Sequence, residues 1–260
     1  MSDYQYVKVE RNGPITIVTL NRPDVMNALH YPAHLECEAV FDDFAADPQQ
    51  WVAIVTGAGE RAFCAGNDLK YQAAGGEMKA VDSGFAALSS RYDLDKPVIA
   101  AVNGLAMGGG FEIALACDII IASEKAVFAL PEPRVGLVAL GGGVHRLPRA
   151  IGVKRAMELI LTSRRVTAQE GKDLGFVNRV VASDALLEAA IELARGICGA
   201  SPMALRASKQ AMMRGLDLTL PEATTQQWDM PAMQALFASA DVVEGPKAFA
   251  EKRAPQWAGR

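Results

Sequence analysis

Two glutamates stand where a carboxylate could do acid–base chemistry. Glu112 lies two residues past the glycine run at 108–110, and Glu132 lies between two prolines. The following proline, Pro133, biases Glu132 toward an extended backbone and places its side chain on a rigid loop. A pair of carboxylates can give and take protons at two ends of one substrate. Each also has an ordinary structural role, Glu112 at a helix start and Glu132 in an ion pair with Arg134.

Two glycine-containing turns could bind a developing negative charge through backbone N–H groups. Ala65-Gly66-Asn67-Asp68 ends an apolar stretch, and residues 104–112 follow a predicted strand and lead into a helix. Glycine at such a junction lets a ligand approach the backbone, and a helix N-terminus adds positive potential there. Two turns of this kind facing each other would form an oxyanion hole, although glycines also mark ordinary tight turns.

Several familiar site patterns are missing from the chain. Neither glycine run, at 108–110 or at 141–143, completes GxGxxG or GxxxxGK[ST], and there is no GxSxG or HExxH. His30 and His34 have helical spacing for a metal, but Pro32 lies between them and no third ligand is evident. We therefore expect no nucleotide fold of these types and no metal site.

The composition is that of an ordinary globular protein, with 260 residues of which half are hydrophobic. A net charge of −4 argues against nucleic acid as the main partner. The four cysteines, Cys37, Cys64, Cys117 and Cys198, have no disulfide or zinc spacing, which favours free thiols in a reducing compartment. No signal peptide or membrane span is visible, so we expect a cytoplasmic protein without a membrane partner.

The first part of the chain predicts an α/β fold. Two β-prone runs at 7–11 and 15–20 flank Asn12-Gly13, which is typical of a hairpin, and a helix is predicted over 32–46. Further buried strands are predicted from short apolar runs at 51–56, 98–102, 119–122 and 177–181. Runs this short and apolar suit strands that helices cover on both faces.

The second part of the chain is predicted to be mostly helical. Helices are expected at 154–162, 167–174 and 184–198, and then at 202–214, 221–239 and 246–252. The last sixty residues are rich in Met, Leu, Phe and Trp. Such an apolar surface must pack either on its own domain or on a symmetric neighbour.

Several stretches of this sequence occur together, and in this order, in one known family. They are Leu20-Asn21-Arg22-Pro23 with Asn27-Ala28-Leu29, residues 62–70, residues 96–104, residues 108–112 with Cys117-Asp118, residues 128–136, and residues 244–253. The chain resembles the enoyl-CoA hydratase/isomerase (crotonase) superfamily over essentially its whole length, and is most like an enoyl-CoA hydratase. The resemblance implies an α/β spiral of ββα units over 1–199 and a helical region over 200–260. That second region builds trimers, often paired into hexamers.

The resemblance also implies roles for individual residues. The N–H groups of Asn67 and Gly109 would form the oxyanion hole for an acyl-CoA thioester. Glu112 would activate water, and Glu132 would deliver a proton to the α-carbon. Seven residues would contact the coenzyme A part or the thioester end of the substrate: Ala28, Ala65, Asp68, Leu69, Lys70, Phe249 and Lys252. Coenzyme A enters as part of the substrate, so no separate cofactor is expected.

The reaction implied is the reversible addition of water to a trans-2-enoyl-CoA, which gives a 3-hydroxyacyl-CoA. Hydratases of the family have glutamate at both positions, whereas an isomerase can rely on one acid at or near Glu132. A polar acyl group, such as a carnitine derivative, is a second possibility that residues 128–132 and the C-terminal stretch loosely suggest. A non-catalytic protein that binds coenzyme A or RNA is the alternative of another class.

Three residues depart from the family pattern. Leu140 stands where Gly or Asp is usual, so the nucleophilic Asp of dehalogenase-like members is absent, and its side chain is expected to crowd the seat of the water. Ala139 replaces a common Pro, and Asn67 is larger than the usual small residue. The stretch at 71–92, which contains three glycines, is expected to close over the acyl group and to be mobile.

Overall fold

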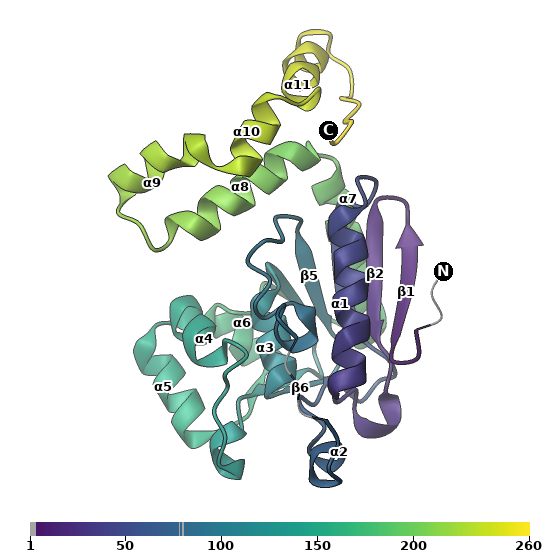
Figure 1. Ribbon diagram of the computed structural model, residues 1–260, viewed down its shortest axis with the longest axis vertical. Helices are drawn as coiled ribbons and strands as arrows, with labels where there is room; N and C mark the ends of the chain where they lie inside the picture. The colour runs from purple at the N-terminus through teal and green to yellow at the C-terminus, as the bar shows by residue number, and fades with distance from the viewer. Residues whose placement is uncertain (1–3, 78, 80) are drawn as a thin grey trace.

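Six strands form the central sheet in the computed structural model, which describes residues 4–77, 79 and 81–260 (Figure 1). In sheet order they are β1 (Val7–Asn12), β2 (Ile15–Leu20), β3 (Val52–Gly57), β5 (Val98–Val102), β7 (Ile119–Ser123) and β10 (Arg179–Val181). β1 and β2 pair in antiparallel fashion, and the other neighbours are parallel. The predicted hairpin and strands are confirmed, although β10 begins two residues later than the strand expected at 177–181 and is not buried.

A second sheet lies beside the first and was not predicted. Its strands, in sheet order, are β4 (Ala62–Cys64), β6 (Leu105–Met107), β8 (Val127–Ala129) and β9 (Val166–Thr167). The chain steps from β3 to β4, from β5 to β6 and from β7 to β8, and a helical segment follows each pair. This arrangement confirms the spiral of ββα units. Strands of two or three residues are too short to show a period of two, which is why the sequence did not indicate them.

The inner strands of the central sheet, β2, β3, β5 and β7, are buried on both faces because their residues alternate between two apolar layers. On β2, Ile15 and Ile17 pack with Leu186 and Ile191 of α7 (Leu186–Cys198) on one face. Val18 and Leu20 of the same strand join the layer on the other face, which contains residues of α1 and α3. Burial on both faces explains the nearly continuous apolar runs in the sequence.

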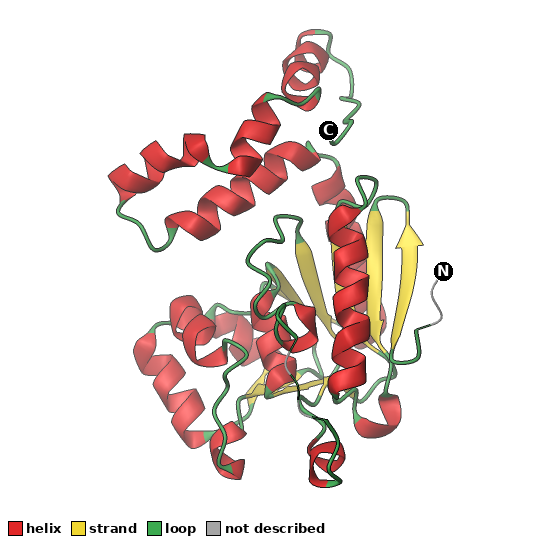
Figure 2. Ribbon diagram, viewed as in Figure 1, coloured by secondary structure: helices red, strands yellow, loops and turns green. Residues whose placement is uncertain are grey.

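Among the described residues, seven helices lie around the two sheets (Figures 1 and 2). They are α1 (Tyr31–Ala46), α2 (Leu69–Ala73), α3 (Gly109–Ala116), α4 (Gly143–Ile151), α5 (Val153–Thr162), α6 (Ala168–Leu174) and α7. Thr167 caps α6 by accepting a hydrogen bond from the Glu170 N–H (3.2 Å), as a helix start at 167 predicts. The sequence did not indicate α4, because a glycine run precedes it and Pro148 lies inside it.

Four helices follow α7 and stand apart from the sheets in Figure 2. They are α8 (Pro202–Gly215), α9 (Leu220–Gln226), α10 (Pro231–Phe237) and α11 (Asp241–Ala250). The single helix expected at 221–239 is wrong, since the segment breaks before Pro231, whose ring fits only the first turn of a new helix. The boundary between a core at 1–199 and a C-terminal region at 200–260 stays a prediction.

The last helix also begins earlier than the expected helix at 246–252. α11 begins at Asp241, so that Pro246 lies inside the helix and not in its first turn. Asp241 is buried, and its carboxylate accepts hydrogen bonds from Ser201 Oγ (2.7 Å) and from the Ala258 N–H (2.8 Å). These contacts between distant parts of the chain fix the helix start, and no local pattern could show them.

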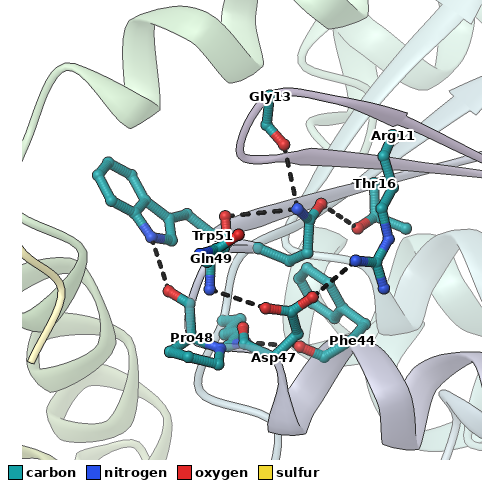
Figure 3. A network of polar contacts seen from close by, with 10 residues as sticks. Arg11, Gly13, Thr16, Phe44, Asp47, Pro48, Gln49 and Trp51 are labelled. Atoms are coloured by element: carbon teal, nitrogen blue, oxygen red, sulfur yellow. Dashed lines mark hydrogen bonds and ion pairs between the residues drawn. The ribbon is translucent and has the colours of Figure 1, made fainter.

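A polar network joins the β1–β2 hairpin to the end of α1 (Figure 3). Arg11 forms an ion pair with Asp47 (2.8 Å). The buried Lys96 donates from Nζ to the main-chain carbonyls of Phe44 (2.5 Å) and Asp47 (2.7 Å). Carbonyls in the last turn of a helix have no intrahelical donor, so these bonds fix the end of α1. The start of the same helix borders the cavity described below.

The structure bears on two further expectations. Cys37, Cys64 and Cys117 are buried free thiols, and Cys198 is a half-buried one. Over the described ranges, no helix has the length and apolar character needed to cross a membrane. The expectation of no signal peptide falls partly on residues 1–3, which lie outside the described residues.

Candidate active site

A cavity of about 580 Å³ opens where the turn after β4, the start of α3, the loop after β8 and the turn before α4 meet. Six of the predicted site residues line it: Ala65, Asn67, Leu69, Gly109, Glu112 and Glu132. Several residues between 77 and 90, within the stretch at 71–92, also line this cavity, whereas positions 78 and 80 lie outside the described residues. The fold thus brings both predicted carboxylates and both predicted N–H donors to one place.

Glu112 projects from the first turn of α3 and is only 4% exposed. Its Oε1 accepts a hydrogen bond from the Gly143 N–H (2.8 Å). A Cβ atom on Gly141 would lie 2.7 Å from Oε2, so glycine at this position leaves room for the carboxylate. Burial raises the pKa of Glu112 to about 7, and the negative charge of Glu132 adds to the rise. The hydrogen bond from the Gly143 N–H acts in the other direction and lowers the pKa. The group can therefore gain or lose a proton near neutral pH.

Leu140, which was expected to crowd the seat of the water, lines the same cavity as Glu112. Its side chain is 82% exposed, and its N–H donates to the Val138 carbonyl (2.8 Å) in a tight turn. Glu112 meets the following turn at Gly141 and Gly143, where there is no side chain to obstruct it. The glycines beyond Leu140 therefore leave room for the carboxylate, and the effect of Leu140 on the position of the water stays a prediction.

Glu132 begins the short 3₁₀ helix η3 (Glu132–Val135), directly after Pro131. Its Oε2 is buried and has no hydrogen-bond partner within the described parts of the chain. Its Oε1 lies 3.0 Å from the place that a Cβ on Gly108 would occupy. Burial raises the pKa of this carboxyl as well. Arg134, the expected ion-pair partner, donates to the Thr162 carbonyl (2.9 Å).

The two predicted N–H donors come from turns that touch each other. Gly109 is the first residue of α3, so its N–H is one that a helix leaves without an intrahelical acceptor. Gly66, with a φ of +92°, lies so close that a Cβ on it would be 3.1 Å from the Gly109 nitrogen. The next residue, Asn67, pairs with Leu29 in an isolated parallel bridge. Both turns are thus held rigidly at the helix N-terminus, which favours negative charge.

The other residues expected to contact coenzyme A are scattered. Asp68 caps α2 through Tyr71 and forms an ion pair with Arg22 (3.0 Å), and these contacts hold the pKa of its carboxyl below the usual range despite burial. Ala28 is buried, and Lys70 is exposed on α2. The remaining two, Phe249 and Lys252, lie on or just after α11, and Figure 1 shows α11 and α2 at opposite ends of the molecule. Their contact with substrate stays a prediction that would need another copy of the chain.

Sequence reasoning missed Phe85 and Arg146 near the cavity, and it considered His34 only as a metal ligand. Phe85 lines the cavity and lies against Gly109, since a Cβ on that glycine would be 2.5 Å from Cε1 of the ring. His34 accepts a hydrogen bond at Nδ1 from the Ala86 N–H (3.1 Å), and burial lowers its pKa to about 4, so it is neutral. Arg146 bonds the turn at Gly141. No local pattern signals these residues, because each acts through contacts distant in sequence.

A family model described as Enoyl-CoA hydratase/isomerase matches residues 10–260. The chain belongs to the enoyl-CoA hydratase/isomerase family. A relative from Salmonella typhi, named carnitinyl-CoA dehydratase, is 45% identical over 255 residues, covering 96% of this chain and 97% of that protein. A relative of the same name from Citrobacter koseri is 44% identical over 255 residues, with the same coverage.

Solved structures agree with this family. The enoyl-CoA hydratase EchA1 from Mycobacterium marinum has a TM-score of 0.92 and 40% identity, covering 98% of this chain and 99% of that one. An enoyl-CoA hydratase from Mycobacterium tuberculosis H37Rv gives a TM-score of 0.92 and 39% identity with the same coverage. The protein is an enzyme of the hydro-lyase type, which disfavours the alternative of a non-catalytic binding protein.

Proposed function

We propose that this family member adds water reversibly to a 2-enoyl-CoA, giving a 3-hydroxyacyl-CoA. The observation that carries the proposal is the placement of Glu112 and Glu132 in one cavity beside the N-terminus of α3. Two carboxylates with raised pKa values beside a helix N-terminus suit a reaction that moves two protons and develops an enolate. Coenzyme A enters with the substrate, and the chemistry needs no separate cofactor.

The proposed reaction forms an enolate and moves two protons. The N–H groups of Asn67 and Gly109 bind the thioester oxygen, which polarises the conjugated double bond. Glu112 takes a proton from water while the water oxygen bonds to the β-carbon. The electrons of the double bond then move to the thioester oxygen, which gives an enolate. Glu132 then gives a proton to the α-carbon as the enolate collapses. The reverse sequence removes water, with the two carboxyls exchanging acid and base roles.

We further propose that the acyl group is polar. Both of the curated relatives described above are named carnitinyl-CoA dehydratase, at 44–45% identity over nearly the whole chain. Loss of water from a carnitinyl thioester leaves an enoyl group that carries a quaternary ammonium. The cavity wall includes the Tyr31 ring and the Glu77 carboxylate, two kinds of group that bind such cations. In the structure both contact the ammonium of Lys79, which lies 2.5 Å from Glu77 and 5.9 Å from the ring centre, so a substrate cation would have to displace it.

A comparison of two substrates tests these proposals. We expect the purified protein to hydrate the trimethylammonium-bearing enoyl-CoA with a higher kcat/KM than crotonyl-CoA. Decay of the enoyl-thioester absorbance measures both reactions. A higher kcat/KM for crotonyl-CoA would contradict the proposal of a polar acyl group and would still support the proposal of a hydratase. If neither band decays while both thioesters bind, the hydratase proposal is wrong.

The pH dependence of hydration gives a second test. Glu112 must be ionised to accept a proton from water, and its pKa is about 7. We therefore expect kcat/KM for hydration to fall about tenfold per pH unit at pH values well below 7. Hydration takes up no net proton and both directions use the glutamate pair in its singly protonated form, so kcat/KM for dehydration should show the same pH profile. A hydration rate that is flat between pH 5 and pH 8 would contradict the assignment of Glu112 as the base.

The apolar surface of the C-terminal region supports one more proposal, which concerns assembly. Large exposed hydrophobic side chains occur there at Met212, Met213, Leu216, Leu220, Trp228, Phe237, Val243 and Phe249. An apolar surface of this extent favours burial against other copies of the chain. We propose a homo-oligomer, a trimer or a dimer of trimers, in which a neighbour brings its Phe249 and Lys252 toward the substrate.

A further inference from the structure

Arg146 of α4 contacts two walls of the cavity through one guanidinium group. Its Nη2 donates to the Ser89 carbonyl (2.8 Å), 57 residues earlier in the chain. Its Nη1 donates to the Gly141 carbonyl (3.4 Å), in the turn that borders Glu112. The guanidinium carbon also lies 5.8 Å from the centre of the Tyr92 ring. A planar group with several donors can hold two backbone segments in a fixed relation.

Ser89 carries this contact onward to Phe85. Its side chain is 2% exposed, and its Oγ accepts a hydrogen bond from the Phe85 N–H (2.8 Å). The Phe85 ring lies against Gly109, and it meets the His34 ring edge-on with centroids 4.5 Å apart. A continuous chain of contacts therefore runs from the turn beside Glu112, through Arg146 and Ser89, to the proposed oxyanion donor.

The segment that holds Phe85 depends on its surroundings for its conformation. Ala86 and Ala87 have φ values of +51° and +55°, which residues other than glycine rarely adopt. Both are buried, and the Ala86 N–H is bonded to His34. Strained backbone of this kind persists only where neighbouring contacts determine it, and it gathers at functional sites. The bond from Arg146 to Ser89 is one such contact.

The turn before α4 is built to admit the guanidinium. Gly142 has a φ of +101°, and a Cβ on it would overlap Nη1 of Arg146. The main chain of Arg146 also donates to the Gly142 carbonyl (2.8 Å). Glycine at this position is therefore required both by the backbone and by the arginine side chain.

We propose that Arg146 is a positioning residue that couples the turn beside Glu112 to the segment that keeps Phe85 against Gly109. The coupling keeps the turn that hydrogen-bonds Glu112 and the Phe85 ring that lies against Gly109 in a fixed relation around the start of α3. It rests on the proposed function for the roles of Glu112 and Gly109, although the contacts themselves do not depend on those roles.

Two charged groups face Glu112 in the structure, Glu132 from η3 and Arg146 from α4. The arginine charge lowers the pKa of Glu112, opposing the effects of burial and of Glu132. Loss of the arginine charge should therefore raise the pH below which kcat/KM for hydration falls, which we call the acidic limb of the pH profile. Loss of the bonds alone should leave that limb in place.

The test compares R146M, R146K and the control R149M. Arg149 lies one turn later on the same helix, is largely exposed and pairs only loosely with Asp217 (3.8 Å). We expect R146M to lose roughly 10- to 100-fold in kcat with a smaller change in KM, since misplacement of about 1 Å costs this much. Its acidic limb should move to higher pH. Amide hydrogen exchange should rise over residues 84–90 and 141–146.

R146K separates geometry from charge, and it serves if R146M folds poorly. Because a single ammonium cannot reproduce both bonds, R146K should show the increased exchange and the lower kcat while keeping the wild-type acidic limb. Exchange and kcat in R146M and R146K equal to those of R149M would overturn the coupling. Hydrogen exchange needs no turnover, so increased exchange in a chain that hydrates no enoyl-CoA would support the coupling and refute the proposed function separately.

Discussion

Replacing Glu112 with Gln is expected to lower kcat for hydration by roughly 10²- to 10⁴-fold, with KM changed only a few-fold. Gln has nearly the same shape and can still accept the Gly143 N–H, but it cannot take a proton from water. The loss therefore falls on the chemical step and not on binding of the thioester. Decay of the enoyl-thioester absorbance, followed at saturating and at limiting substrate, measures both parameters.

Stability offers a control for this variant. The folded-state pKa of Glu112 is about 7, against an ordinary value of 4.5, so the folded protein binds more protons than the unfolded chain between these values. The free energy of unfolding due to this group therefore decreases as pH rises through that window. Gln removes the buried charge, so the Tm of the variant at pH 8 should be no lower than that of the wild type.

The same variant separates a hydratase from an isomerase. An isomerase that relies on one acid at Glu132 would keep most of its activity without Glu112. If Glu112→Gln still isomerises a 3-enoyl-CoA to the 2-enoyl-CoA and hydrates as fast as the wild type, the role assigned to Glu112 would be refuted. Glu158→Gln provides a matched control, because this exposed glutamate of α5 is paired with Arg164.

Replacing Glu132 with Gln is expected to lower kcat for hydration by a similar factor, roughly 10²- to 10⁴-fold. The reason differs, because this carboxyl is proposed to supply the proton that the α-carbon gains. Its Oε2 has no partner among the described residues, so the change breaks no hydrogen bond recorded for that atom. Removal of a buried carboxyl with a raised pKa should also leave the Tm at pH 8 undiminished.

Isotope exchange distinguishes the roles of the two glutamates. In deuterated water, the wild type should exchange the α-proton of the 3-hydroxyacyl-CoA through reversible turnover. Glu132→Gln should abolish this exchange in step with its loss of hydration. Full hydration by Glu132→Gln would show that another group delivers the proton, and the two-carboxylate mechanism would then be wrong.

Local patterns in the sequence were sufficient for much of the architecture. Apolar runs predicted the strands of the central sheet, and Asn12-Gly13 predicted the hairpin. The predicted helix boundaries were wrong at two prolines in the C-terminal region. Pro231 begins a new helix within a segment expected to be continuous, whereas Pro246 lies inside a helix that it was expected to begin. The buried contacts of Asp241 decide the second case.

The sequence by itself determined the residue types of the candidate site and the turns on which they lie. Glu112 and Glu132 beside glycine-containing turns, together with the resemblance they carry, indicated acid–base chemistry on a thioester. Only the tertiary structure decided that these groups share one cavity and that burial raises their pKa values. It also showed that Leu140 lines this cavity while largely exposed and that Arg146 reaches Ser89. The physical reason is that burial and hydrogen bonding at this site depend on segments tens of residues apart, and a local pattern carries no information about them.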